Sequence, residues 1–142
     1  MTDDEFLATF EKCTLPSEQW THAAHVRAAF LIANQSSWSE ALSSIRSRIQ
    51  AYNAATDTPE AIDRGYHETI TQAFMRLVYA ANLQTGPHAT AEQFCQRHPE
   101  LLEKRALFAY YSRDRLMTWE AKREFIEPDL QPLPIVEIRT PD

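Results

Sequence analysis

"YHETITQAFMRLVYAANL", residues 66–83, is the stretch that decides the fold, because it reads as one long amphipathic helix. Its apolar side chains recur at helical spacing: Tyr66, Ile70, Phe74, Leu77 and Val78. The helix is expected to end near the Gly-Pro pair at residues 86–87, since glycine is typical of helix C-termini.

Helix start signals precede most of the other apolar stretches. A first helix is expected after Thr2 or Asp3, and Ser17 is expected to cap a second that runs to residue 34. Ser37 with Glu40 has the spacing of a capping box and predicts a helix to residue 55. Further helical segments are expected from residue 57 past residue 65, after residue 90, near residues 100–104 and over residues 113–125.

The composition favours one all-α domain. The 142 residues contain two glycines, and β-branched runs are nearly absent before residue 135. We therefore expect a single compact bundle of five to six helices, with a helical body at residues 1–127 and an extended, proline-rich tail at residues 128–142.

Charge and hydropathy exclude several classes of partner. The formal net charge is -6 and there is no basic stripe, which argues against nucleic acid. No apolar run is long enough to span a membrane, and there is no signal peptide, so a soluble cytoplasmic protein is expected. A small-molecule ligand is the expected partner, and whether the chain forms a homodimer is left open.

Two histidines lie three residues apart in "WTHAAH", residues 20–25. On a helical wheel, His22 and His25 lie about 140° and 160° from Arg27, the one charged residue inside this helix. They therefore lie on the inward face, on adjacent turns, close enough to share an ion.

A third histidine lies within the apolar arc of the long helix. His67 has Thr71 one turn further on and Glu68 at the edge of the arc. Three inward imidazoles on two helices suit a divalent transition metal such as Zn, Fe, Mn or Ni. We expect His22, His25 and His67 as metal ligands, with Glu68 as a fourth ligand, a hydrogen-bond partner of a ligand or a general base, and Thr71 orienting a ligand or water.

The alternative is structural: each histidine is hydrogen-bonded within the core and has no ligand. A further group, Tyr110, Tyr111 and Arg113, is a candidate substrate-binding wall. There the competing interpretation is that Ser112 caps a helix while the aromatic side chains pack.

These motifs resemble a family of small bacterial helical proteins of unassigned function. The resemblance lies in W-x-H-x-x-H, Y-H-E-T-I-T, a Y-Y-S segment and the E-P-D-L-x-P-L-P tail, and covers residues 10–134. It implies a bacterial origin and no particular chemistry. The arrangement of histidines on facing helices is also similar to that of DinB-like metal-binding bundles, at the level of ligands alone.

Two functions therefore stand as hypotheses. The first is a metal-dependent enzyme, of hydrolase or lyase type, acting on a small polar metabolite. The second is a non-catalytic helical module that binds a metal or a small molecule.

Overall fold

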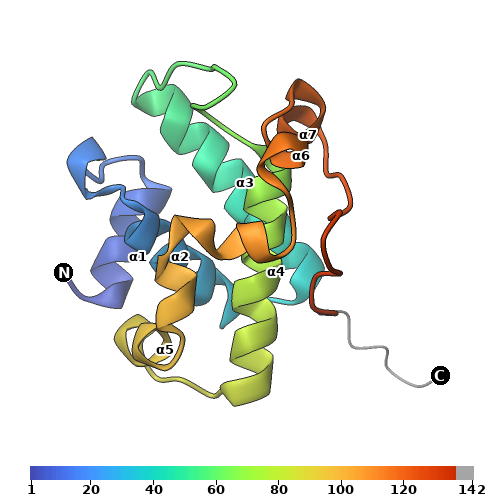
Figure 1. Ribbon diagram of the computed structural model, residues 1–142. Helices are drawn as coiled ribbons and strands as arrows, with labels where there is room; N and C mark the ends of the chain where they lie inside the picture. Colours follow the sequence, from blue (N-terminus) through green and yellow to red (C-terminus); the bar gives the residue numbers. More distant parts are fainter. Residues whose placement is uncertain (137–142) are drawn as a thin grey trace.

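The computed structural model describes residues 1–136 and is all-α, as expected (Figure 1). Five helices have seven residues or more within that range, and no strand occurs in it. The α-helices are α1 (Asp3–Glu11), α2 (His22–Ala33), α3 (Trp38–Ala55), α4 (Glu68–Thr85), α5 (Ala91–Arg97), α6 (Arg113–Leu116) and α7 (Trp119–Arg123). Short 3-10 helices lie at Ser17–Gln19, Pro99–Leu102 and Lys104–Ala109.

Two helix starts follow directly from local sequence. Thr2 caps α1 in a capping box with Glu5, and Ser37 caps α3 in a capping box with Glu40. In each case the hydroxyl accepts from a free backbone N–H, and the glutamate accepts from the N–H of the capping residue. Both predicted starts are confirmed.

The start of α2 was predicted four residues too early. Ser17 opens a 3-10 turn, and α2 begins at His22, where the Thr21 hydroxyl accepts from the Ala24 N–H at 3.2 Å. The consequence is that His22 occupies the first turn of the helix and His25 the second.

Two other helix predictions were wrong. Most of residues 57–67 is not helical, and the chain reverses there through paired backbone hydrogen bonds between Ala61 and Arg64. The helix expected over residues 113–125 is broken in two, because the Thr118 hydroxyl caps a new helix by accepting from the Ala121 N–H.

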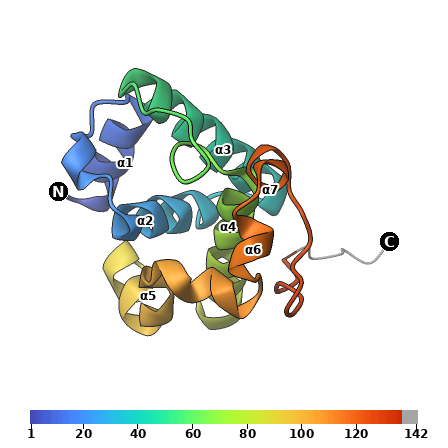
Figure 2. The same cartoon turned by 45° about the horizontal axis from the view of Figure 1, so that its top comes forward.

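Helix α2 lies in the middle of the molecule and packs against α3, α4 and α5 (Figures 1 and 2). Its inner face carries fully buried side chains, among them Phe30 and Ile32. The long α4 also packs against α3 and α7. The second helix and the long helix therefore pack directly against each other. Within residues 1–136, no helix is long and apolar enough to cross a membrane.

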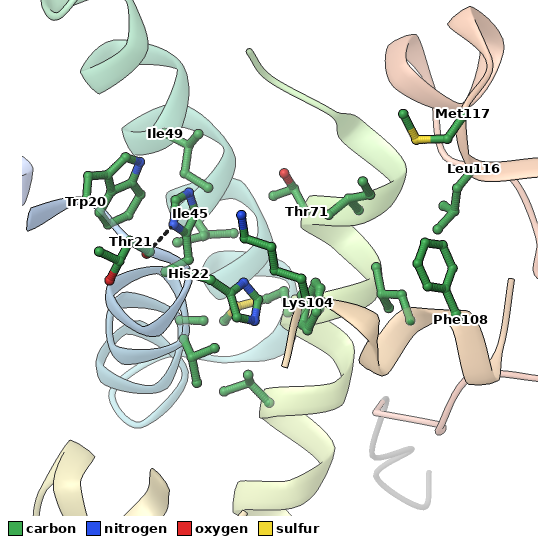
Figure 3. Close-up of a pocket in the computed structure, with 18 residues that line it drawn as sticks. Trp20, Thr21, His22, Ile45, Ile49, Thr71, Lys104, Phe108, Leu116 and Met117 are labelled. Atoms are coloured by element: carbon green, nitrogen blue, oxygen red, sulfur yellow. Dashed lines mark hydrogen bonds between the residues drawn. The ribbon is translucent and has the colours of Figure 1, made fainter. Parts of the chain in front are cut away.

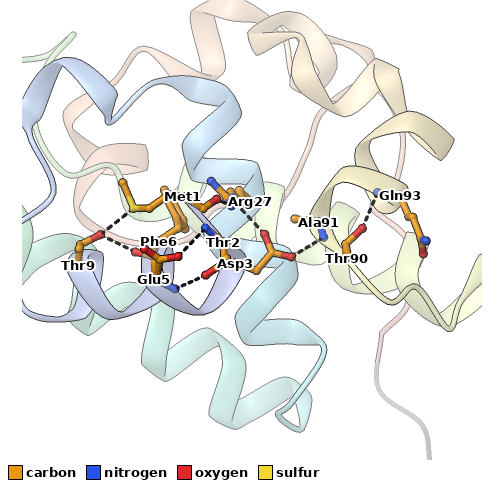
Figure 4. A network of polar contacts seen from close by, with 10 residues as sticks. All are labelled: Met1, Thr2, Asp3, Glu5, Phe6, Thr9, Arg27, Thr90, Ala91 and Gln93. Carbon is orange, nitrogen blue, oxygen red and sulfur yellow. Dashed lines mark hydrogen bonds and ion pairs between the residues drawn. The ribbon is translucent and has the colours of Figure 1, made fainter.

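Arg27 fixes the rotation of α2 through ion pairing on its outer side (Figure 4). Its Nε donates to Asp3 at 3.0 Å, and a terminal nitrogen donates to the Met1 carbonyl at 2.9 Å. The other oxygen of Asp3 accepts from the Ala91 N–H at the start of α5. Arg27 and its partner Asp3 thus hold α1 and the start of α5 against this side of α2. The two histidines of α2 lie on a different side of the helix.

The described part of the tail, residues 128–136, carries neither helix nor strand and lies against the body. The Leu130 N–H donates to the Tyr110 carbonyl at 2.9 Å, and Leu133 is buried. The expectation of an extended tail also concerns residues 137–142, which lie outside the described residues.

Candidate functional site: a cavity between α2 and α4

A cavity of about 380 Å³ lies between α2 and α4, with further walls from α3, α6 and the 3-10 helix Lys104–Ala109 (Figure 3). This volume is within the usual range of small-molecule sites. Most of the walls are apolar, and the polar side chains are few. The lining comprises Trp20, Thr21, His22, His25, Val26, Ala29, Ile45, Ile49, Ile70, Thr71, Phe74, Met75, Val78, Lys104, Leu107, Phe108, Leu116 and Met117.

His22 is held at the cavity by the 3-10 helix Pro99–Leu102, which follows α5. Its Nε2 lies 3.0 Å from the Leu101 carbonyl, which only accepts, so this nitrogen carries the proton and Nδ1 carries the lone pair. The ring packs edge-on against Phe74 of α4, with centroids 4.8 Å apart. Burial lowers the pKa of His22, so the ring is neutral at pH 7.

His25 has the opposite tautomer. Its Nδ1 donates to the Thr21 carbonyl at 2.8 Å, so the lone pair is on Nε2. The ring lies over Trp20, with centroids 3.8 Å apart. Burial, helped by the nearby His22 and Lys104, lowers the pKa of His25 to about 4. His25 is therefore a neutral hydrogen-bond acceptor at physiological pH.

Lys104 gives the cavity its positive charge. Its side chain extends between α2 and α4 in Figure 3, and its ammonium adds to the effect of burial in lowering the pKa of both His22 and His25. The lining contains these three basic side chains and no aspartate or glutamate. Because both histidines are neutral at pH 7, Lys104 is the charged side chain of this lining, in a chain of net charge -6.

His67 does not line the cavity, which corrects its expected role as a metal ligand. It caps α4, because its Nδ1 accepts from the Ile70 N–H at 3.1 Å. Its Nε2 donates to the Leu116 carbonyl at 2.9 Å. Both ring nitrogens are thus in use, and no lone pair is left for a metal. Burial lowers the pKa of His67, which is consistent with a neutral capping ring.

This capping role predicts the response of His67 to substitution. His67→Ala removes the cap and the bond to Leu116, so we expect the free energy of unfolding to fall by about 1–2 kcal/mol. His67→Asn should recover about half of that loss, because asparagine is a strong N-cap. Urea unfolding of the two variants measures the difference. Equal losses in both, or bound metal in the wild type that His67→Ala removes, would contradict the capping role.

Glu68 is also absent from the cavity wall, so its expected role beside a metal is corrected too. Arg46 of α3 donates two hydrogen bonds to its carboxylate, at 2.8 and 2.5 Å, and the Tyr66 hydroxyl donates a third at 2.6 Å. The hydrogen bonds with Glu68 raise the pKa of Arg46. This buried glutamate joins α3 to the start of α4.

Of the remaining predicted site residues, Thr71 lines the cavity with His22 and His25. The expected substrate-binding group does not reach this cavity. Tyr111 is fully buried, and its hydroxyl donates to the Ile126 carbonyl at 2.7 Å. Tyr110 lines a separate hollow beside Pro134, and Arg113 is exposed at the start of α6.

The donor set that the metal hypothesis expects is not assembled in the described residues. Within the described part of the chain, no three His, Cys, Asp or Glu side chains are grouped so as to hold a metal ion. His22 and His25 each keep one lone pair and line the same cavity, but the third histidine is committed to helix capping. The expected three-histidine centre is therefore not formed.

Sequence reasoning missed Lys104 and the aromatic partner of His25. Lys104 lies in "EKRALF", residues 103–108, a charged stretch with no motif to set one lysine apart. Trp20 was recoverable, since it opens the "WTHAAH" stretch and is close to His25 in sequence. Comparison with protein-family models, curated proteins and solved structures gave no match.

Proposed function

We propose that the protein binds a small organic molecule with an apolar body and an anionic group in the cavity between α2 and α4. The observation that supports this most directly is the lining itself: apolar walls, three basic side chains and no carboxylate. Apolar walls with a few converging polar groups are typical of small-molecule sites.

The two parts of the ligand have separate partners. The apolar body is matched by side chains from both helices, such as Ala29 of α2 and Phe74 of α4. The anionic group is matched by the Lys104 ammonium, because an ionised donor gives a stronger hydrogen bond than a neutral one. Neutral His22 and His25 add no charge to the part of the cavity that holds the apolar body.

The metal-dependent enzyme remains the second hypothesis, and the donor set does not favour it. Catalytic zinc sites normally use three protein ligands and keep one position open. His22 and His25 offer two ring nitrogens at this cavity, and no carboxylate or third imidazole lines it. Elemental analysis of protein purified without chelator tests this alternative, and a stoichiometric metal lost in His25→Phe would restore it.

A pair of dyes tests the proposed function. Anilinonaphthalene sulfonate has an apolar body and an anionic group, and N-phenyl-naphthylamine has a similar body without the charge. We expect both to bind. Lys104→Gln should weaken the sulfonate about tenfold, the loss of one charge-assisted hydrogen bond at a partly exposed site, and change the neutral dye less than about twofold. Fluorescence titration measures both affinities.

Two controls locate the dyes. Lys12→Gln removes an exposed lysine at the end of α1, away from the cavity, and should leave both affinities unchanged. Ala29→Leu adds carbon atoms to the cavity wall and should weaken both dyes together. If neither dye binds, or if Lys12→Gln weakens the sulfonate as much as Lys104→Gln, the proposal is wrong.

A further inference from the structure

His25 presents a fixed hydrogen-bond acceptor that no donor in the described part of the chain uses. With Nδ1 donating to the Thr21 carbonyl, the lone pair lies on Nε2. Among residues 1–136, no donor is bonded to that nitrogen, and the partly buried ring leaves it accessible from the cavity. Since His25 lines the cavity, the partner of Nε2 is solvent or a bound molecule.

The ring of His25 is held in place from two sides. The Thr21 bond fixes its tautomer, and the stack on Trp20 fixes its plane. Trp20 is itself stacked on the fully buried Phe10, with centroids 4.4 Å apart. An acceptor held this rigidly loses little conformational entropy when a ligand binds.

The positive charge near His25 determines which kind of hydrogen-bond donor on a ligand can pair with Nε2. The cavity already holds the Lys104 ammonium, which repels a cationic donor such as an amine. A neutral donor avoids that repulsion, and a hydroxyl on an apolar skeleton is the simplest such group. His25 is itself neutral at physiological pH, so it accepts and does not compete as a donor at Nε2.

We propose that the ligand of this cavity carries a hydroxyl group that donates to Nε2 of His25, in addition to its anionic group. This inference rests on the proposed function and narrows its ligand to hydroxylated apolar acids. A ligand without the hydroxyl covers Nε2 without replacing the hydrogen bond that solvent makes there, and so leaves a partly buried acceptor unpaired.

The test uses a matched pair of neutral competitors, β-naphthol and its methyl ether, which differ in the hydrogen-bond donor. Each displaces N-phenyl-naphthylamine in a fluorescence titration near pH 7.5. We expect the wild type to prefer β-naphthol about tenfold, because the methyl ether covers the acceptor without pairing it. In His25→Phe the ring over Trp20 is kept and the acceptor is lost, so the two competitors should bind within about twofold of each other.

The outcomes separate the two proposals. If the dye binds and the wild type shows no preference for β-naphthol, the hydroxyl inference is overturned while the proposed function stands. That comparison needs no variant, so it holds even if His25→Phe does not fold. A preference that His22→Phe abolishes and His25→Phe keeps would also overturn it, since Nδ1 of His22 would then be the acceptor. If the dye does not bind, the proposed function is overturned and the hydroxyl inference with it.

Discussion

Substitution of Arg46 by methionine should lower the free energy of unfolding by about 3 kcal/mol, because it leaves the Glu68 carboxylate buried without its cation. Glu68 has a side-chain exposure of 12%, and Arg46 supplies two of its three side-chain hydrogen bonds. Glu68→Gln should cost less, about 2 kcal/mol, since the amide still accepts from the Tyr66 hydroxyl and Arg46 is 37% exposed.

A matched control lies two residues away on the same helix. Arg48 of α3 pairs with Glu11 at 2.6 Å, and both side chains are about one-third exposed. Arg48→Met should therefore cost less than about 1 kcal/mol. Urea unfolding at neutral pH compares the three variants. If Glu68→Gln keeps wild-type stability and instead abolishes a chemical activity of the protein, Glu68 is a catalytic group and does not serve to join α3 to α4.

Acidification should destabilise the protein well before the carboxylates titrate. The pKa of His25 is lowered from 6.5 to about 4 by burial, so between these values the unfolded chain binds more protons than the folded one. The stability contributed by neutral His25 is complete above about pH 6.5 and is lost as the pH falls toward about 4. At about 1.36 kcal/mol per pKa unit, the whole loss is about 3 kcal/mol, of which about 2 falls between pH 7.5 and 5.

Protonation of three other histidines should also lower the stability of the fold on acidification. Burial also lowers the pKa of His22, His67 and His88, so their neutral forms stabilise the fold over the upper part of the same window. The carboxylates whose pKa is lowered lose their contribution at lower pH, below about 4.5. They are Glu5, Glu40, Glu60 and Asp129.

His25→Phe isolates the contribution of one ring. Phenylalanine keeps an aromatic ring against Trp20 and does not titrate, so the variant should lose about 2 kcal/mol less than the wild type between about pH 7.5 and pH 5. Urea unfolding at the two pH values gives both differences. A variant whose acid destabilisation equals that of the wild type would show that His25 is not the group responsible.

The helices that were predicted well are those whose signals are local. The capping boxes of Thr2 and Ser37 involve residues three positions apart, and the apolar arc of α4 repeats within one turn. Such interactions form within a short segment, so the sequence contains all the information they need. The break at residue 118 was missed although Thr118 is a local cap too. The residues on both sides of it have helical periodicity, so the sequence indicated one continuous helix there.

Part of the candidate site was also predicted, because that part depends on local helical periodicity. His22 and His25 on one face of one helix, with Thr71 toward them, follow from helical periodicity, and the structure places all three at one cavity. The roles of His67 and Glu68 did not follow, because each depends on a group distant in sequence: the Leu116 carbonyl for His67 and Arg46 for Glu68. Periodicity indicates which face a side chain is on, and not which donor or acceptor meets it there.

By itself, the sequence determined an all-α chain and an inward pair of histidines on a helix. Only the tertiary structure decided what those histidines do. It placed the Leu101 carbonyl against Nε2 of His22, brought Lys104 between α2 and α4, and placed the Leu116 carbonyl against Nε2 of His67. A histidine can bind a metal, accept a proton or cap a helix, and the choice is set by which of its two nitrogens already has a partner.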